Sequence, residues 1–162
     1  MRGFTLILLI FWTNYNFISA SNYKALSYKS DFYEVLASSD TIKINKQIRL
    51  LSTYTISEKK AFTGTLMMKK AGFIKPLGQK MKFFNEGKSK LEQAIKDEPQ
   101  NAEYRFLRLV IQENCPPVLK YSHNISEDLK KVTVAYAQFT PELKAAVLKY
   151  SKTSKNLKEE DL

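Results

Sequence analysis

Two arginines in the segment NAEYRFLRLVIQENCPP, residues 101–117, are the side chains of this sequence best suited to hold another molecule. On a helix, Arg105, Arg108 and Gln112 follow one another at spacings of three and four residues, so they share one strip of the surface. A guanidinium group binds a carboxylate or a phosphate through two parallel hydrogen bonds. The strip is therefore a candidate site for an anionic small ligand or a lipid headgroup.

The residues around these arginines favour a different role for the segment. Six of the eight side chains from Tyr104 to Ile111 are apolar, and on a helix they cover most of the circumference. Such a helix must be contacted on nearly all sides, which places it at the centre of a bundle. The arginines then need acidic partners or solvent, and Glu86 and Glu92 on the preceding helix are the candidate partners. We expect this structural pairing, with the anion site as the alternative.

Few side chains are suited to catalysis. His123 is the only histidine, and its loop PPVLKYSHNIS offers no recognisable triad partner. Cys115 is the only cysteine, which excludes an internal disulfide and a cysteine-rich metal site, and we expect it to be a small, mostly buried residue. No metalloprotease, phosphate-loop or nucleophile-elbow motif occurs. The sequence predicts no enzyme, no catalytic residue, no cofactor and no metal ion, with a hydrolase as a remote alternative.

Helices account for almost the whole chain in this interpretation. Asp40, Asn101 and Thr140 are suited to cap helices, and Pro116–Pro117 ends the arginine-bearing helix because proline lacks the amide donor. Gly64 inside a helical pattern suggests that another helix approaches closely there. No strand signal is found. The prediction is one all-α domain over 21–151, a compact bundle of six to seven helices, followed by a charged, frayed tail over 152–162. The expected helices are 31–37, 40–52, 57–71, 79–98, 101–115, 126–139 and 140–151.

The first twenty residues, MRGFTLILLIFWTNYNFISA, have the order of a secretory signal: a positive charge, an apolar run and small residues before a cleavage point after Ala20. The nine residues from Phe4 to Trp12, all apolar except Thr5, are too short at about 1.5 Å each for a bilayer core of roughly 30 Å. No cysteine near the cut could carry a lipid. We therefore expect a soluble protein exported to the periplasm or secreted, without a lipid anchor or a transmembrane segment.

The chain is basic, with 26 Lys and Arg against 16 Asp and Glu. In a cytosolic protein this balance would suggest nucleic acid, but export argues against that partner. The lysines are also spread along the sequence and form no single block. Scattered lysines of this kind usually make a solvated surface.

One stretch resembles a tetratricopeptide repeat. The pattern Gly87-x3-Leu91-x2-Ala94-Ile95-x3-Pro99 is similar to the second helix of a repeat that leads into the next one. This resemblance implies a helix pair over 79–98 and 101–115. Arginines 105 and 108 stand where the family has tryptophan and leucine, and no second copy occurs 34 residues away, so a single hairpin within a bundle is expected rather than an array.

Longer stretches, among them KKAFTGTLMMKKAGF and LKYSKTSK, look like those of a family of uncharacterised exported bacterial proteins of this length. The resemblance implies an all-helical periplasmic protein and assigns no catalytic residue. Our leading hypothesis is a non-enzymatic interaction or scaffold protein. It would hold a protein of the cell envelope through helical faces and an exposed loop over 115–125 that carries Tyr121 and His123. The alternative is the anionic ligand on Arg105 and Arg108.

Overall fold

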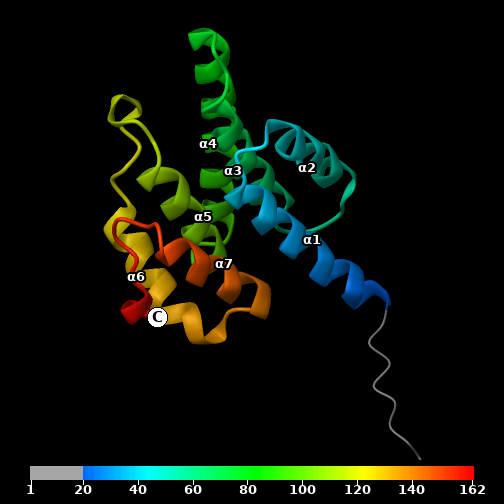
Figure 1. Ribbon diagram of the computed structural model, residues 1–162, viewed down its shortest axis with the longest axis vertical. Coiled ribbons are helices and arrows are strands. Elements are labelled where there is room, and N and C mark those ends of the chain that lie inside the picture. Colours follow the sequence, from blue (N-terminus) through cyan, green and yellow to red (C-terminus); the bar gives the residue numbers. More distant parts are fainter. Residues whose placement is uncertain (1–19) are drawn as a thin grey trace, which may run out of the picture.

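The computed structural model describes residues 20–162, and the side chains from Tyr28 onward. Every regular element in this range is helical, which confirms the predicted all-α bundle (Figure 1). The predicted leader over 1–20 lies outside the described residues, except that Ala20 is the first residue of α1. The seven α-helices of this range are α1 (Ala20–Ala37), α2 (Thr41–Thr53), α3 (Lys59–Ala71), α4 (Leu77–Asp97), α5 (Ala102–Glu113), α6 (Ile125–Ala135) and α7 (Pro141–Ser151). The same range contains three short 3₁₀ turns: η1 (Pro117–Leu119), η2 (Tyr136–Gln138) and η3 (Glu159–Asp161).

The predicted helix starts are confirmed where a polar side chain caps the first turn. The Asp40 carboxylate accepts hydrogen bonds from the amides of residues 42 and 43, and the Asn101 side chain accepts from residues 103 and 104. Thr140 caps α7, whose first residue is Pro141. These caps satisfy amides that have no partner inside the helix. The largest difference lies in α1, which is already helical from Ala20, whereas the sequence predicted its start at residue 31.

Two glycines let α3 and α4 touch backbone to backbone, as the sequence predicted for Gly64. A Cβ atom added to Gly64 would lie 2.5 Å from the carbonyl oxygen of Gly87, and one added to Gly87 would lie 2.6 Å from the carbonyl oxygen of Gly64. The two helices therefore pack along each other at a distance that no larger residue permits (Figure 1).

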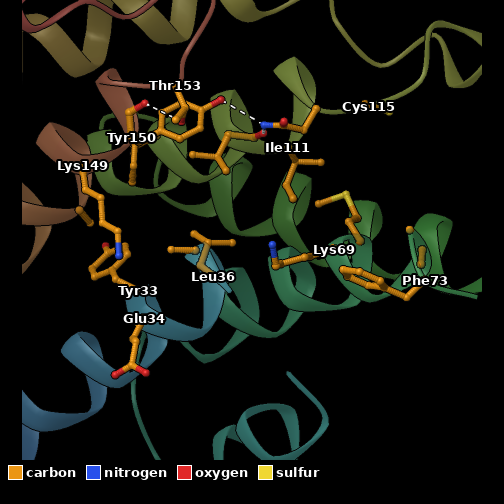
Figure 2. Close-up of a pocket in the computed structure, with 18 of the residues that line it drawn as sticks. Tyr33, Glu34, Leu36, Lys69, Phe73, Ile111, Cys115, Lys149, Tyr150 and Thr153 are labelled. Carbon is orange, nitrogen blue, oxygen red and sulfur yellow. Dashed lines mark hydrogen bonds between the residues drawn. The ribbon is translucent and has the colours of Figure 1, made fainter. Parts of the chain in front are cut away.

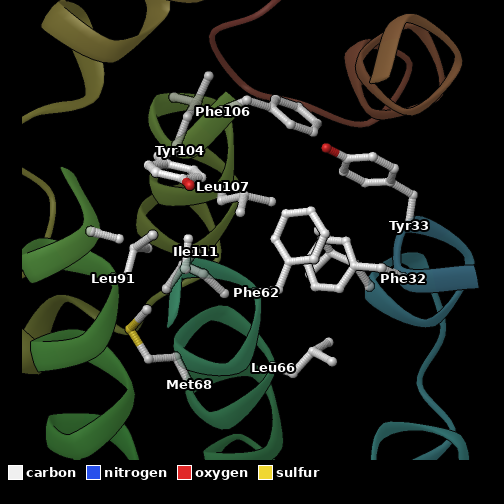
Figure 3. Packing of buried hydrophobic residues seen from close by; sticks show 14 of the residues in the cluster. Phe32, Tyr33, Phe62, Leu66, Met68, Leu91, Tyr104, Phe106, Leu107 and Ile111 are labelled. Atoms are coloured by element: carbon white, nitrogen blue, oxygen red, sulfur yellow. The ribbon is translucent and has the colours of Figure 1, made fainter. Parts of the chain in front are cut away.

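Helix α5 occupies the centre of the bundle, as expected from its apolar circumference. Tyr104, Phe106, Leu107 and Leu109 are almost fully buried. Phe32 of α1 stacks on Phe62 of α3, with ring centroids 3.8 Å apart, at the edge of the same core (Figure 3). Elements from both halves of the chain thus share one hydrophobic core around α5.

The prediction of a frayed tail over 152–162 is wrong. Leu157 is fully buried, and Ser154 is 6% exposed. The Glu113 carboxylate at the end of α5 accepts hydrogen bonds from the Ser154 hydroxyl (2.7 Å) and from the Asn156 side-chain amide (2.7 Å). In the sequence, Leu157 is a single apolar residue among lysines, and its neighbours do not show that the tail packs on the bundle. Glu113, the partner that Ser154 contacts, is 41 residues earlier in the chain.

Candidate functional site

The arginine strip on α5 is buried and paired within the chain. Arg105, Arg108 and Gln112 are 7%, 4% and 2% exposed. The Nε and Nη2 atoms of Arg108 donate to the Asp128 carboxylate at 2.6 and 2.7 Å, and its Nη1 donates to Glu92 at 2.9 Å. Burial alone would lower the pKa of Arg108, but the hydrogen bonds to Asp128 raise it above its ordinary value, so the group stays charged.

Arg105 has a similar position in the same network. Its Nη2 atom donates to the carbonyl of Pro99 at 2.9 Å, and its Nη1 atom lies 3.4 Å from Glu127 and 3.5 Å from Asp128. With both arginines engaged by the chain itself, neither presents a free fork to solvent. The structural pairing is confirmed for Glu92, whereas Glu86 is exposed and the main partner, Asp128, was not foreseen.

Gln112, the third residue of the strip, faces the loop between α5 and α6. Its side-chain amide nitrogen donates to the side-chain oxygen of Asn124 at 3.3 Å. Among the described residues, the buried Nε atom of Arg105 and the buried Oε1 atom of Gln112 have no hydrogen-bond partner. The burial of the three side chains and the internal partners of both guanidinium groups favour the structural pairing over an anion fork.

The loop after α5 also differs from its predicted role. Tyr121 is only 2% exposed, and its hydroxyl donates to Glu92 at 2.5 Å. Its ring meets Phe84 edge-on with the centroids 5.8 Å apart. His123 is exposed, with its ring 6.4 Å from that of Tyr121. Tyr121 therefore anchors the loop to the core and is not available to a partner, which leaves His123 as the accessible member of the predicted pair.

A groove lies among the helices that the structure describes. Its volume is about 950 Å³, and it lies between α1, α3, the start of α4, α5 and α7 (Figure 2). Apolar side chains from six elements and from the turn after α3 form most of its wall: Leu36, Met68, Phe73, Phe84, Phe106, Val110, Ile111, Leu119 and Ala146. None of them was singled out as a site residue, because most lie on the inward faces of predicted helices, and Phe73 and Leu119 lie in predicted loops.

The polar groups of the groove are mostly cationic. Lys69, Lys80 and Lys149 line it from three different helices. Figure 2 shows Lys69 and Lys149 among the side chains that line the groove. Among residues 28–162 no hydrogen bond or ion pair of these three ammonium groups is found. Burial without a compensating partner lowers the pKa of Lys69.

Three of the neutral polar side chains of the groove already have partners within the chain. The hydroxyl of Tyr33 donates to Glu103, and that of Tyr150 donates to Glu113. Asn114 donates to the carbonyl of Val110 and to the Tyr150 hydroxyl. The two tyrosines therefore contribute mainly ring surface to the wall.

The two carboxylates of the groove are not equivalent. Glu34 forms an ion pair with Lys43 at 3.2 Å outside the groove, which partly neutralises it. Glu142 lines the opposite wall on α7. The balance of three lysines against these two carboxylates makes the groove positively charged.

Cys115 lies on the wall of the groove, half-buried and not in a disulfide. Burial raises the pKa of its thiol, which the charge of Lys88 offsets only in part. A thiol with a raised pKa is a weak nucleophile, because the reactive form is the thiolate. Cys115 is therefore suited to report on occupancy of the groove rather than to react with a substrate.

No cluster of three or more His, Cys, Asp or Glu side chains with the geometry of a metal site occurs in the described part of the chain. None of the helices over 20–162 has the length and hydrophobicity needed to cross a bilayer. The chain matches no family model, and no curated protein or solved structure is similar to it. The site must therefore be interpreted from its own geometry.

Proposed function

We propose that this protein is a non-catalytic binding protein whose site is the groove between α1, α3, α5 and α7. The observation that carries the proposal is the apolar groove of about 950 Å³, built jointly by elements from both halves of the chain. Ligand pockets typically measure about 300–1,000 Å³ and combine an apolar wall with a few polar groups. The groove has this size and this composition.

The chemistry of the wall favours binding over catalysis. General acid–base and nucleophilic catalysis need a base or a nucleophile whose pKa suits the reaction. Apart from two tyrosines, the titratable groups of the groove are lysines, carboxylates and a thiol of raised pKa, namely Lys69, Lys80, Lys149, Glu34, Glu142 and Cys115. The leader-like first twenty residues support a place of action outside the cytoplasm, in the periplasm or beyond.

A protein of the cell envelope is the second candidate ligand, and one observation favours it. Val118 on η1 is 82% exposed, and it lies between Pro116 and Leu119, which both line the groove. Figure 1 shows this loop projecting from the bundle. An apolar side chain at that position could contact a partner that extends beyond the groove.

Filling the groove from the exposed side of α7 tests the proposal. Ala145 is exposed and lines the groove, so Ala145→Trp should occupy it without disturbing the core. Ala137 is also exposed but lies outside the groove, which makes Ala137→Trp the matched control. Nile red, a neutral apolar dye, should bind the wild type and the control saturably, with one dye per protein.

The Ala145→Trp variant should bind Nile red at least about tenfold more weakly, a loss of about 1.4 kcal/mol. Circular dichroism and thermal unfolding should show that both variants are folded. Equal dye binding by the two tryptophan variants, or binding that never saturates, would show that the groove is not the site.

A further inference from the structure

We propose that the ligand of the groove is a long-chain carboxylate, with its acyl chain against the apolar wall and its head near Lys69. This inference rests on the proposed binding function and adds the chemical class of the ligand. The structure supplies two independent features that such a molecule would match, an extended apolar wall and a set of uncompensated ammonium groups.

Several helices contribute apolar side chains to the wall of the groove. Leu36 of α1, Met68 of α3, and Phe106 and Ile111 of α5 all line it, and Phe84 of α4 extends it. Each methylene group that moves from water to such a wall contributes about 0.8 kcal/mol. A flexible acyl chain therefore gains binding energy in proportion to the length of wall it covers.

The charge of the groove selects the head of the ligand. Lys69 is half-buried on α3 beside apolar side chains, and no described carboxylate lies within ion-pair distance of its ammonium group. An ammonium group in such a place costs free energy until an anion compensates it. Burial lowers the pKa of Lys69, and a bound carboxylate would reverse that shift.

The neutral polar groups of the groove do not compete for this role. The hydroxyls of Tyr33 and Tyr150 and the amide of Asn114 already donate to oxygen atoms of the chain. A ligand with a neutral head, such as an alcohol, could accept hydrogen bonds from the ammonium groups but would leave their charge uncompensated. A ligand with a cationic head would meet three lysines against two carboxylates, Glu34 and Glu142, so the balance of charge in the groove opposes it.

The experiment compares three ligands that share one chain and differ in the head. Oleate, oleyl alcohol and oleylamine are each used to displace Nile red from the full-length protein, below the concentrations at which they self-associate. Oleate should displace the dye at a concentration at least about tenfold lower than oleyl alcohol does. Oleylamine should be the weakest of the three.

Two lysine variants assign the difference to the groove. Lys69→Met keeps the apolar stem and removes the charge, so it should weaken oleate binding about tenfold and leave oleyl alcohol unchanged. Lys46→Met removes the same charge from an exposed position on α2, and it should bind both ligands as the wild type does. The comparison separates a local contact from the overall positive charge of the protein.

The single thiol provides a readout that needs no variant. Cys115 lines the groove, so bound oleate should slow its alkylation by a maleimide, measured by intact-protein mass spectrometry, whereas the same concentration of oleyl alcohol should protect it less. This measurement stands even if Lys69→Met fails to fold.

The possible outcomes separate the two proposals. Equal displacement by oleate and oleyl alcohol would overturn the anionic ligand and leave the apolar site intact. In another outcome, Nile red binds saturably and is displaced by an acidic amphipathic peptide but by none of the three acyl-chain ligands. That result would overturn the acyl ligand and indicate a protein partner. Absence of saturable dye binding would overturn both the site and its ligand.

Discussion

Arg108 and Asp128 form a two-point ion pair in the interior of the bundle, with N–O distances of 2.6 and 2.7 Å. Arg108 lies in the middle of α5 and Asp128 in the first turn of α6, so the pair fixes the two helices in register. Glu92 joins the pair to α4, and through Tyr121 to the loop between α5 and α6. One polar network thus connects α4, α5, α6 and the loop between α5 and α6.

Removing one member of this pair should be strongly destabilising. Asp128→Ala leaves the guanidinium of Arg108 buried without its main partner, which costs about 3–5 kcal/mol of unfolding free energy. The double variant Arg108→Met, Asp128→Leu should recover much of that loss, because it buries no charge. Urea unfolding measures both values. The exposed pair of Lys60 and Asp97 is the control, since Lys60→Met should leave the urea midpoint unchanged.

An equal loss in the single and double variants would contradict this account. It would mean that the side-chain volumes, and not the compensation of charge, hold α5 and α6 together.

The crossing of α3 and α4 should not tolerate a methyl group. Gly64→Ala and Gly87→Ala each place a Cβ within 2.6 Å of a backbone oxygen, which cannot move aside as a flexible side chain can. Each should lower the unfolding free energy by about 1–3 kcal/mol. Gly78→Ala, in the first turn of α4 with no atom within 4 Å of the added Cβ, should be neutral or stabilising by up to about 1 kcal/mol. Thermal unfolding of the three variants tests the difference, and equal behaviour would refute the close approach.

The tail should detach as the pH falls. Burial by itself raises the pKa of Glu113, but hydrogen bonds from Ser154, Tyr150 and Asn156 outweigh it and lower the pKa below 4.5. A lowered carboxylate pKa contributes stability that is fully present above the ordinary value of 4.5 and is lost as the pH falls through the value in the folded protein. Glu113→Gln should therefore destabilise the protein at neutral pH.

Below about pH 4 the difference between Glu113→Gln and the wild type should shrink. Urea unfolding at a series of pH values provides the measurement. Two stability curves that stay parallel down to acidic pH would show that the Glu113 carboxylate does not hold the tail through its charge.

Tyr121 should respond to mutation as a core residue. Tyr121→Phe removes only the hydroxyl that donates to Glu92, which costs about 1 kcal/mol. Tyr121→Ala also empties the space beside Phe84 and should cost about 3–5 kcal/mol. His123→Ala, two residues away and exposed, should have no measurable effect. Thermal unfolding measures these effects. Equal melting temperatures for Tyr121→Ala and His123→Ala would contradict this assignment.

The parts of the fold that depend on neighbours in the sequence were predicted well. The caps at Asp40, Asn101 and Thr140 act on amides two or three residues away, so the sequence contains all the information they need. The central position of α5 followed from its apolar circumference. The close approach at Gly64 was also predicted, but its partner Gly87 became clear only in three dimensions.

The candidate site could not be predicted, because its residues come from four regions of the chain. Leu36, Met68 and Ile111 each lie on an inward helical face, and nothing local indicates that those faces leave a groove between them. Lys69 reads as one of many solvated lysines. The wrong predictions have the same origin, since the burial of Tyr121 and of Leu157 depends on the distant residues Glu92 and Glu113.

The sequence by itself determined that this chain is helical, where most of its helices begin and end, and which helix forms the centre. It could do so because hydrogen bonding along a helix and the apolar periodicity of a helix act over only a few residues. Only the tertiary structure decided that the arginines of α5 are neutralised by Asp128 and Glu92 while Lys69 is not neutralised by any described carboxylate. The reason is physical: the free energy of a buried charge depends on what lies within a few ångströms in space, and in a folded chain those neighbours are mostly distant in sequence.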